Sequence, residues 1–154
     1  LGTIGFSTVA RADIAGCPGF ESGSASQETV DHFYALRAVD IVRKATMGDR
    51  AKLAPLVAPD ASFTIWRGDA ATSAREEGVA GIIEMAADLK AASFEYVVVR
   101  SGPWAEAPGS CAWSTKVIWR TADRAAGVSV IFDFEDGRMT RAMGTEVAIA
   151  EGEI

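Results

Sequence analysis

The chain contains no asparagine, one glutamine (Gln27) and one histidine (His32). Without asparagine there is no N-glycosylation site, and the shortage of amides removes side chains that commonly donate hydrogen bonds to an oxyanion. His32 falls early in an expected helix, beside Asp31, where we expect it to be exposed to solvent. Polar chemistry would therefore depend mainly on carboxylates, guanidinium groups, hydroxyls and the backbone.

Cysteine is also scarce, since only Cys17 and Cys111 are present. Neither has a Cys-x-x-Cys spacing or a histidine nearby in the sequence, so redox and zinc sites have no support, and we expect neither a metal nor a cofactor. One alternative is a disulfide that joins the N-terminal segment to a later strand. Two reduced thiols in a cytoplasmic protein is the interpretation that we favour.

Basic residues and long apolar runs are few as well. The 15 lysines and arginines are outnumbered by 21 aspartates and glutamates, which leaves a net charge of −6. Nucleic acids and anionic membranes attract basic surfaces, and no apolar run here reaches the roughly 18–20 residues that span a bilayer. We therefore expect no nucleic-acid partner and no membrane partner.

Residues 1–26 are rich in glycine, serine and alanine and show no periodicity, which predicts an irregular N-terminal arm. Residues 10–12 (ARA) resemble the cleavage site of an export signal, but the basic start and apolar core of such a signal are missing. The remainder, residues 27–154, has no further composition shift. With 49% apolar residues in the chain, it is expected to form one domain with its own core.

Hydrophobic periodicity predicts a helix, a short helix, a strand, a third helix and four more strands, in that order. The helices are expected at residues 27–47, 49–57 and 78–92. The strands are expected at residues 62–67, 94–101, 112–121, 128–134 and 139–149. Residues 68–77 have no apolar periodicity and are predicted to form a loop. Strands that follow helices in this way indicate an α+β fold.

The clearest local signal lies in residues 128–149, VSVIFDFEDGRMTRAMGTEVAI. Two apolar-alternating runs flank Asp136-Gly137, and this pair supplies the positive φ angles of a tight hairpin turn. The last two strands are therefore predicted to be antiparallel neighbours.

Three motifs in this order carry a resemblance to a known family: Met47-Gly48-Asp49, residues 56–61 (LVAPDA) and residues 132–139 (FDFEDGRM). Residues 27–149 resemble the nuclear-transport-factor-2-like superfamily, and within it the SnoaL-like (polyketide-cyclase-like) branch. The resemblance implies a cone-shaped, curved antiparallel sheet wrapped around about three helices, as in cystatin-like folds. The superfamily includes isomerases, cyclases, dehydratases and non-catalytic association domains, so the resemblance implies no single activity.

The catalytic positions of these relatives do not carry over. Isomerase-like members use a tyrosine and two acids at positions that fall near Ile41, Ile65 and Val130, all apolar in this chain. The polar positions of cyclase-like members fall near Ser129 or Val130 and near Gly144. We expect the three apolar residues to line a small apolar pocket.

Four other side chains remain as candidates for a site. Glu146 lies near a position that is often polar in relatives, where a buried carboxylate could act as a general base. A solvent-facing glutamate is the alternative. Tyr34 shares a helix face with Ile41 and could donate a hydrogen bond to a carbonyl oxygen, or fill the core. Trp66 could stack on a ligand at the pocket mouth.

Arg67, the next residue along, could bind an anion, although we favour an ion pair between Arg67 and Asp69. Trp113 and Trp119 share one strand face, which must either pack on the helices or form a dimer surface. We expect this strand face to form a dimer surface, which makes the chain a homodimer.

Two functions stay open. The first is a cofactor-independent isomerase, cyclase or dehydratase of a small carbonyl compound. The second is a non-catalytic homodimeric domain that binds a hydrophobic ligand or a partner protein. Two polar groups that converge in one pocket would favour the enzyme.

Overall fold

The computed structural model describes residues 27–89, 95–103, 112–120 and 126–148. The helices are α2 (Gln27–Thr46), α3 (Arg50–Leu53) and α4 (Gly78–Leu89). The strands are β1 (Val57–Arg67), β2 (Ala70–Ser73), β3 (Glu95–Pro103), β4 (Trp113–Arg120), β5 (Ala126–Glu135) and β6 (Arg138–Ala148). The predicted arm and both cysteines lie outside the described residues, so the disulfide and the reduced thiols both stay predictions.

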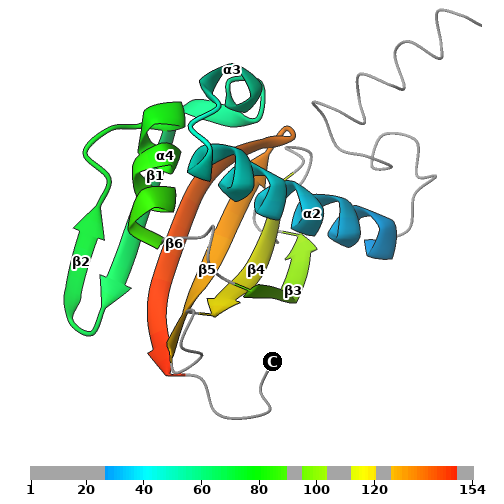
Figure 1. Ribbon diagram of the computed structural model, residues 1–154. Helices are drawn as coiled ribbons and strands as arrows, with labels where there is room; N and C mark the ends of the chain where they lie inside the picture. Colours follow the sequence, from blue (N-terminus) through cyan, green and yellow to red (C-terminus); the bar gives the residue numbers. More distant parts are fainter. Residues whose placement is uncertain (1–26, 90–94, 104–111, 121–125, 149–154) are drawn as a thin grey trace, which may run out of the picture.

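The six strands form one curved, open sheet in the order β2-β1-β6-β5-β4-β3 (Figure 1). β3 to β6 pair antiparallel with one another, as predicted. β1 differs from the antiparallel sheet we expected, because it pairs in parallel with β6, with Ile65 opposite Gly144. Parallel neighbours require a long connection, and the chain between Arg67 and Arg138 supplies it.

Two boundaries near the start of the sheet correct the sequence-based prediction. Residues 68–77, predicted to be a loop, include β2, which folds back on β1 with Thr64 opposite Ser73. The short second helix ends at Leu53 instead of reaching Val57, which begins β1 five residues before the predicted start. Pro55 explains the early end, because proline has no N–H to continue the helix.

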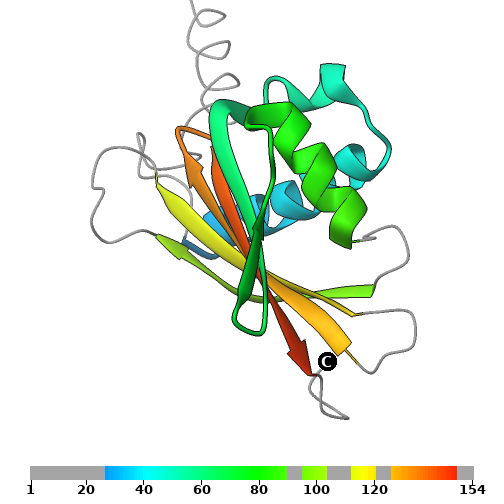
Figure 2. The ribbon, with the colours of Figure 1, turned by 90° about the vertical axis from the view of Figure 1, so that its left-hand side faces the viewer.

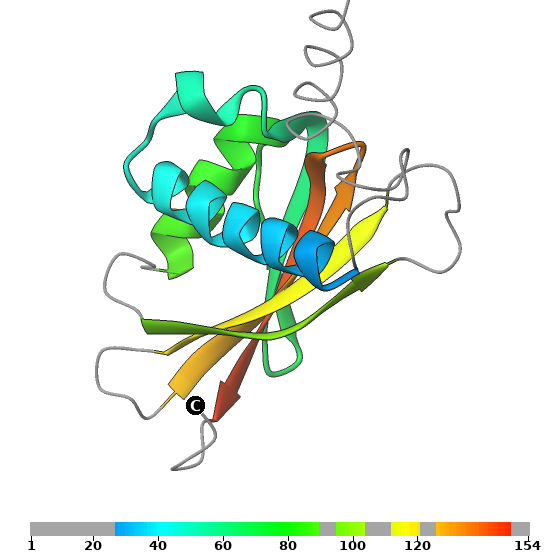
Figure 3. The ribbon, with the colours of Figure 1, turned by 90° about the vertical axis from the view of Figure 1, so that its right-hand side faces the viewer.

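Helices α2 and α4 cover one face of the sheet (Figures 2 and 3). α2 contacts β3 and β4, while α4 contacts β1 and α2. The buried residues of α2 recur at three- and four-residue spacing and form one apolar stripe. They are Tyr34, Ala35, Ala38, Val39, Ile41, Val42 and Ala45. This stripe and the covered face of the sheet form the core, and we call that face of the sheet the inner face.

β4 alternates strictly between buried and half-buried residues, and the buried set contains Trp113 and Trp119. Both tryptophans belong to the core between the sheet and the helices, with exposed fractions of 1% and 2%. Packing on the helices is therefore the correct alternative, and this pair of tryptophans provides no dimer surface. A homodimer would therefore have to form through another surface.

The predicted hairpin between β5 and β6 is confirmed. Asp136 has a φ of 51° and Gly137 a φ of 83°, as the tight turn requires. Arg37 of α2 donates a hydrogen bond from Nη1 to the carbonyl oxygen of Gly137, at 3.0 Å. The helix is thus tied to the tip of the hairpin.

Candidate functional site

The centre of the fold is filled by apolar side chains. Ile41, Ile65 and Val130, expected to line a pocket, have exposed fractions of only 0%, 2% and 0%. Gly144 lies beside them, and a Cβ atom at this position would be 3.4 Å from Ile65 Cγ1 and 3.2 Å from Val128 Cγ1. Ile41, Ile65, Val130 and Gly144 are therefore packed in the core of this chain.

Tyr34 is buried, with 1% of its surface exposed. Its ring stacks on Trp113 at a centroid distance of 6.0 Å and packs against Phe134 at 5.0 Å. Burial raises the pKa of the phenol to about 12, while the charge of Arg37 acts in the opposite direction. These contacts place Tyr34 in an aromatic cluster near the hairpin end of the sheet.

Glu146 is on the inner face, because it pairs with the buried Val128, but its side chain is 48% exposed. Its Oε2 accepts a hydrogen bond from Arg67 Nε at 3.1 Å, and Arg67 Nη1 contacts Asp88 Oδ2 at 3.2 Å. Arg67 therefore bridges β6 and α4. The ion pair that we favoured between Arg67 and Asp69 is not what forms, since the guanidinium turns to these two carboxylates from neighbouring elements.

Tyr34 and Glu146 do not meet. Tyr34 packs against Phe134, which pairs with Met139, and Glu146 lies seven residues further along β6. At about 3.3 Å per residue, the two groups are separated by roughly 23 Å along the strand. The structure brings Glu146 together with Arg67 and leaves Tyr34 at the other end of the sheet.

Trp66 lies on the outer face of the sheet, because it alternates along β1 with the inward Ile65 and Arg67. It is 39% exposed, and its register partner on β6 is Thr145. Met143 and Ile131 oppose each other on β6 and β5 and are 38% and 42% exposed. We call Trp66, Ile131 and Met143 the outer patch.

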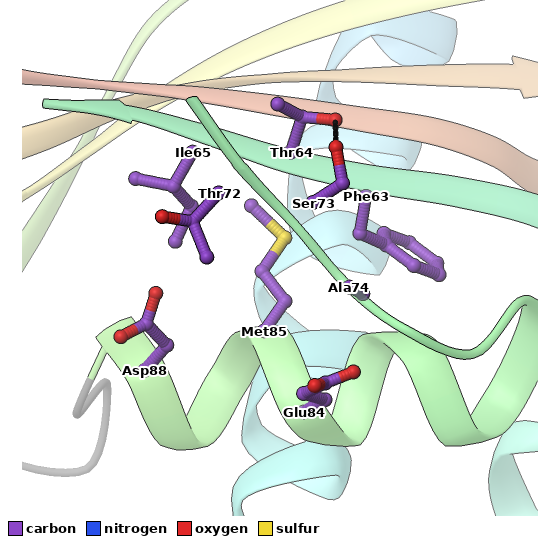
Figure 4. A pocket seen from close by; sticks show the side chains of 9 residues that line it. All are labelled: Phe63, Thr64, Ile65, Thr72, Ser73, Ala74, Glu84, Met85 and Asp88. Carbon is purple, nitrogen blue, oxygen red and sulfur yellow. Dashed lines mark hydrogen bonds between the residues drawn. The ribbon is translucent and has the colours of Figure 1, made fainter. Parts of the chain in front are cut away.

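A cavity of about 200 Å³ lies between α4 and the β1–β2 hairpin (Figure 4). Phe63, Thr64, Ile65, Thr72, Ser73, Ala74, Glu84, Met85 and Asp88 line it. Of the residues expected at a site, only Ile65 takes part. Sequence patterns missed the cavity because they missed β2, whose four exposed residues show no apolar alternation.

The two carboxylates at this cavity are both paired with arginines. Glu84 accepts hydrogen bonds from the backbone N–H of Arg75 at 2.7 Å and from its Nε at 3.1 Å. These bonds lower the pKa of Glu84 below its ordinary value. Asp88 contacts Arg67, as described above. Both groups are thus anionic partners of exposed or half-buried guanidinium groups.

The described part of the chain holds neither a metal-binding cluster nor a membrane-spanning helix. No group of three or more histidine, cysteine, aspartate or glutamate side chains there is arranged to hold a metal ion. None of the described helices is long and apolar enough to cross a membrane. His32 is exposed, as expected from its place on the helix.

Comparison with known proteins identifies the fold. No family model matches the chain, and no curated protein matches its sequence. An NTF2-like protein of unknown function from Silicibacter pomeroyi matches with 16% identity and a TM-score of 0.51, over 77% of this chain and 98% of that one. A domain of unknown function with a cystatin-like fold from Nostoc punctiforme matches with 14% identity and a TM-score of 0.53, over 80% and 81%.

A member of the SnoaL-like family from Agrobacterium tumefaciens also matches, with 16% identity, a TM-score of 0.44, and coverage of 73% of this chain and 99% of that one. At identities this low, likeness establishes the fold alone. The nuclear-transport-factor-2-like, cystatin-like fold expected from the three motifs is thereby confirmed.

Proposed function

We propose that this chain, which has the nuclear-transport-factor-2-like fold, is a non-catalytic homodimeric domain that binds a small, mostly apolar ligand. The observation that carries the proposal is the packing of Ile41, Ile65 and Val130, which are almost fully buried where isomerase-like relatives place a tyrosine and two acids. The separation of Tyr34 from Glu146 supports it, because a general base and a proton donor must both reach one substrate.

The outer patch supports the homodimer. Its three large apolar side chains are exposed and lie on adjacent strands, β1, β6 and β5, near the middle of the outer face. Exposed large apolar side chains that gather on one face are typical of protein interfaces, particularly with a polar rim. Arg141 and Lys116 lie beside it on the same face and supply charge at its edge.

Sedimentation equilibrium at micromolar concentration tests the dimer. We expect the wild-type chain to have twice its chain mass of 16.2 kDa. Ile131→Glu should give the monomer, because it buries a charge at the centre of the interface. Leu36→Glu is the matched control, since Leu36 is 51% exposed on α2, away from the outer face, and this variant should stay dimeric. A wild-type species of 16.2 kDa would contradict the dimer.

One observation favours a second candidate, a cofactor-independent isomerase, cyclase or dehydratase of a small carbonyl compound. Glu146 and Arg67 form a carboxylate–guanidinium pair on the inner face, where a base and an anion-stabilising group would be useful. Their exposure weakens this candidate, because the two side chains are 36% and 48% exposed and water competes with a substrate for both of them.

An activity screen separates the two candidates. We expect no turnover of enolisable carbonyl compounds by the wild-type chain. Turnover that is lost in Glu146→Gln and retained in Glu76→Gln, an exposed glutamate before α4, would establish the enzyme instead. A cytoplasmic location remains an expectation that depends on Cys17 and Cys111.

A further inference from the structure

The cavity between α4 and the β1–β2 hairpin has an apolar floor. Phe63 and Ile65 come from β1, Ala74 follows β2, and Met85 extends from α4 toward the hairpin (Figure 4). Methionine adapts its shape to a ligand more readily than branched side chains do. At about 200 Å³, the cavity is smaller than the roughly 300–1,000 Å³ of pockets for drug-sized ligands. Its occupant is therefore a short apolar body.

The charged lining of this cavity has one sign. Glu84 and Asp88 are four residues apart on α4, so they share one helix face, and both line the cavity (Figure 4). Among the residues that the structure describes, the lining contains no lysine, arginine or histidine. An anionic ligand would meet like charges there, whereas a cationic ligand would meet opposite charges.

A ligand cation can replace the arginine partner of either carboxylate. Arg75 is 90% exposed, and exposed ion pairs contribute little because water screens them and the long side chain loses freedom. Arg67 has Glu146 as a second partner and would keep that contact if Asp88 turned to a ligand. A ligand cation can therefore take the place of either guanidinium at small cost.

One hydroxyl group completes the polar side of the cavity. Thr72 pairs with the inward Ile65, so its side chain lies on the face of the hairpin that α4 covers. Thr64 and Ser73 lie on the opposite face, where their hydroxyl groups are 3.2 Å apart and hydrogen-bond to each other. A hydroxyl oxygen has two lone pairs and can accept from an N–H donor while it donates elsewhere. A primary ammonium group has three such donors, which carboxylates and hydroxyls can satisfy together.

We propose that this cavity binds a small organic cation, a primary ammonium group on a short apolar chain, with the ammonium between Glu84 and Asp88 and the chain against Ile65 and Met85. The inference rests on the proposed function, because it gives the place and class of ligand for the binding domain. It requires neither the dimer nor any chemical step.

The probes are n-hexylammonium and 1-hexanol, which share a six-carbon chain and differ in charge. Binding is measured at pH 7 by isothermal titration calorimetry, with the full chain. We expect the ammonium to bind about tenfold more tightly than the alcohol, and this preference should fall when salt rises from about 20 mM to about 500 mM. In Glu84→Gln/Asp88→Asn the two probes should bind within about twofold of each other.

The matched control is Glu76→Gln/Glu77→Gln, which removes the same charge from two exposed residues just before α4 and should keep the tenfold preference. Circular dichroism verifies that each variant is folded. Equal binding of the two probes by the wild-type chain would contradict the preference for a cation and leave an apolar ligand site, with the proposed function intact.

An equal loss of the ammonium preference in both double variants would also contradict the proposed site, because the attraction would then come from the net charge of the chain. No binding of either probe would overturn the site, whereas the dimer measurement would still test the proposed function separately.

Discussion

Arg141 places two nitrogens on one carboxylate oxygen of Asp133, with Nε at 2.7 Å and Nη2 at 2.6 Å from Oδ2. The other oxygen, Oδ1, accepts a hydrogen bond from Ser114 Oγ at 2.6 Å. The Asp133 side chain is only 2% exposed, although it belongs to the outer face of β5. One carboxylate thus joins β4, β5 and β6, and its buried charge is compensated.

Replacing Asp133 with asparagine should destabilise the fold. Asp133→Asn keeps the size of the side chain but removes the negative charge that Arg141 contacts, so the guanidinium keeps only a neutral amide oxygen as its partner. We expect the free energy of unfolding in urea to fall by about 1–3 kcal/mol. Glu135→Gln, on the same strand at a half-buried position, should change it by less than about 0.5 kcal/mol. Equal effects would mean that the Asp133 contacts are not special.

Tyr34 should make the fold sensitive to alkali. Its pKa is about 12 in the folded chain against an ordinary value of 10.0, so the folded state holds its proton more tightly than the unfolded state. Its contribution is therefore complete below pH 10 and is lost between about pH 10 and pH 12, at up to about 1.4 kcal/mol per pH unit.

Urea unfolding at a series of pH values measures this effect, with Tyr34→Phe as the comparison. The variant should lose less stability than the wild type over the same pH range. Parallel curves for the two proteins would show that Tyr34 does not titrate differently in the folded chain.

Arg37 should stabilise the packing of α2 against the hairpin. Its guanidinium lies 4.5 Å from the centroid of the Phe33 ring and donates to the carbonyl of Gly137, and burial lowers its pKa. Arg37→Ala removes both contacts, and we expect a loss of about 1–2 kcal/mol in urea unfolding. Arg43→Ala, at an exposed position of the same helix, should stay within about 0.5 kcal/mol. The hypothesis fails if both variants behave alike.

Gly81 should resist replacement by alanine. A Cβ atom there would lie 2.4 Å from the carbonyl oxygen of Glu76 and 2.7 Å from Cδ2 of Phe63, so backbone must shift. Alanine favours helix by about 1 kcal/mol over glycine, but we expect the clash to outweigh this and to lower stability by about 1–3 kcal/mol. Thermal unfolding measures the sign, and Ala87→Gly, at an exposed position of α4, measures the propensity alone. A stabilised Gly81→Ala would show that α4 can move away from β1.

The elements that could be predicted are those with a strong local pattern. Asp136-Gly137 between alternating runs specified its hairpin because only a few residue pairs tolerate two positive φ angles. β4 could also be assigned to one face by alternation. The sequence could not decide whether this face packs on the helices or forms a dimer surface, because Trp113 and Trp119 suit a core and an interface equally well.

The cavity and the pairing of β1 could not be predicted for a physical reason. β2 is held by backbone hydrogen bonds to β1, so its exposed alanine, threonine and serine side chains need no apolar pattern. The parallel pairing of β1 with β6 joins residues far apart in the sequence, and neither strand alone records its partner. Glu146 and Arg67 become neighbours only through this pairing.

The position of β6 between β1 and β5 also bears on how the protein is made. A ribosome that has just completed β1 must add about 70 residues before β6 begins, which takes several seconds at roughly 5–20 residues per second. During that time the edge of β1 that pairs with β6 has no partner, and the apolar Phe63 and Ile65 lack their neighbours Ala142 and Gly144. A nascent chain truncated before β6 should therefore be recognised by chaperones and proteases as unfolded, because the sheet is continuous only when β6 lies between β1 and β5.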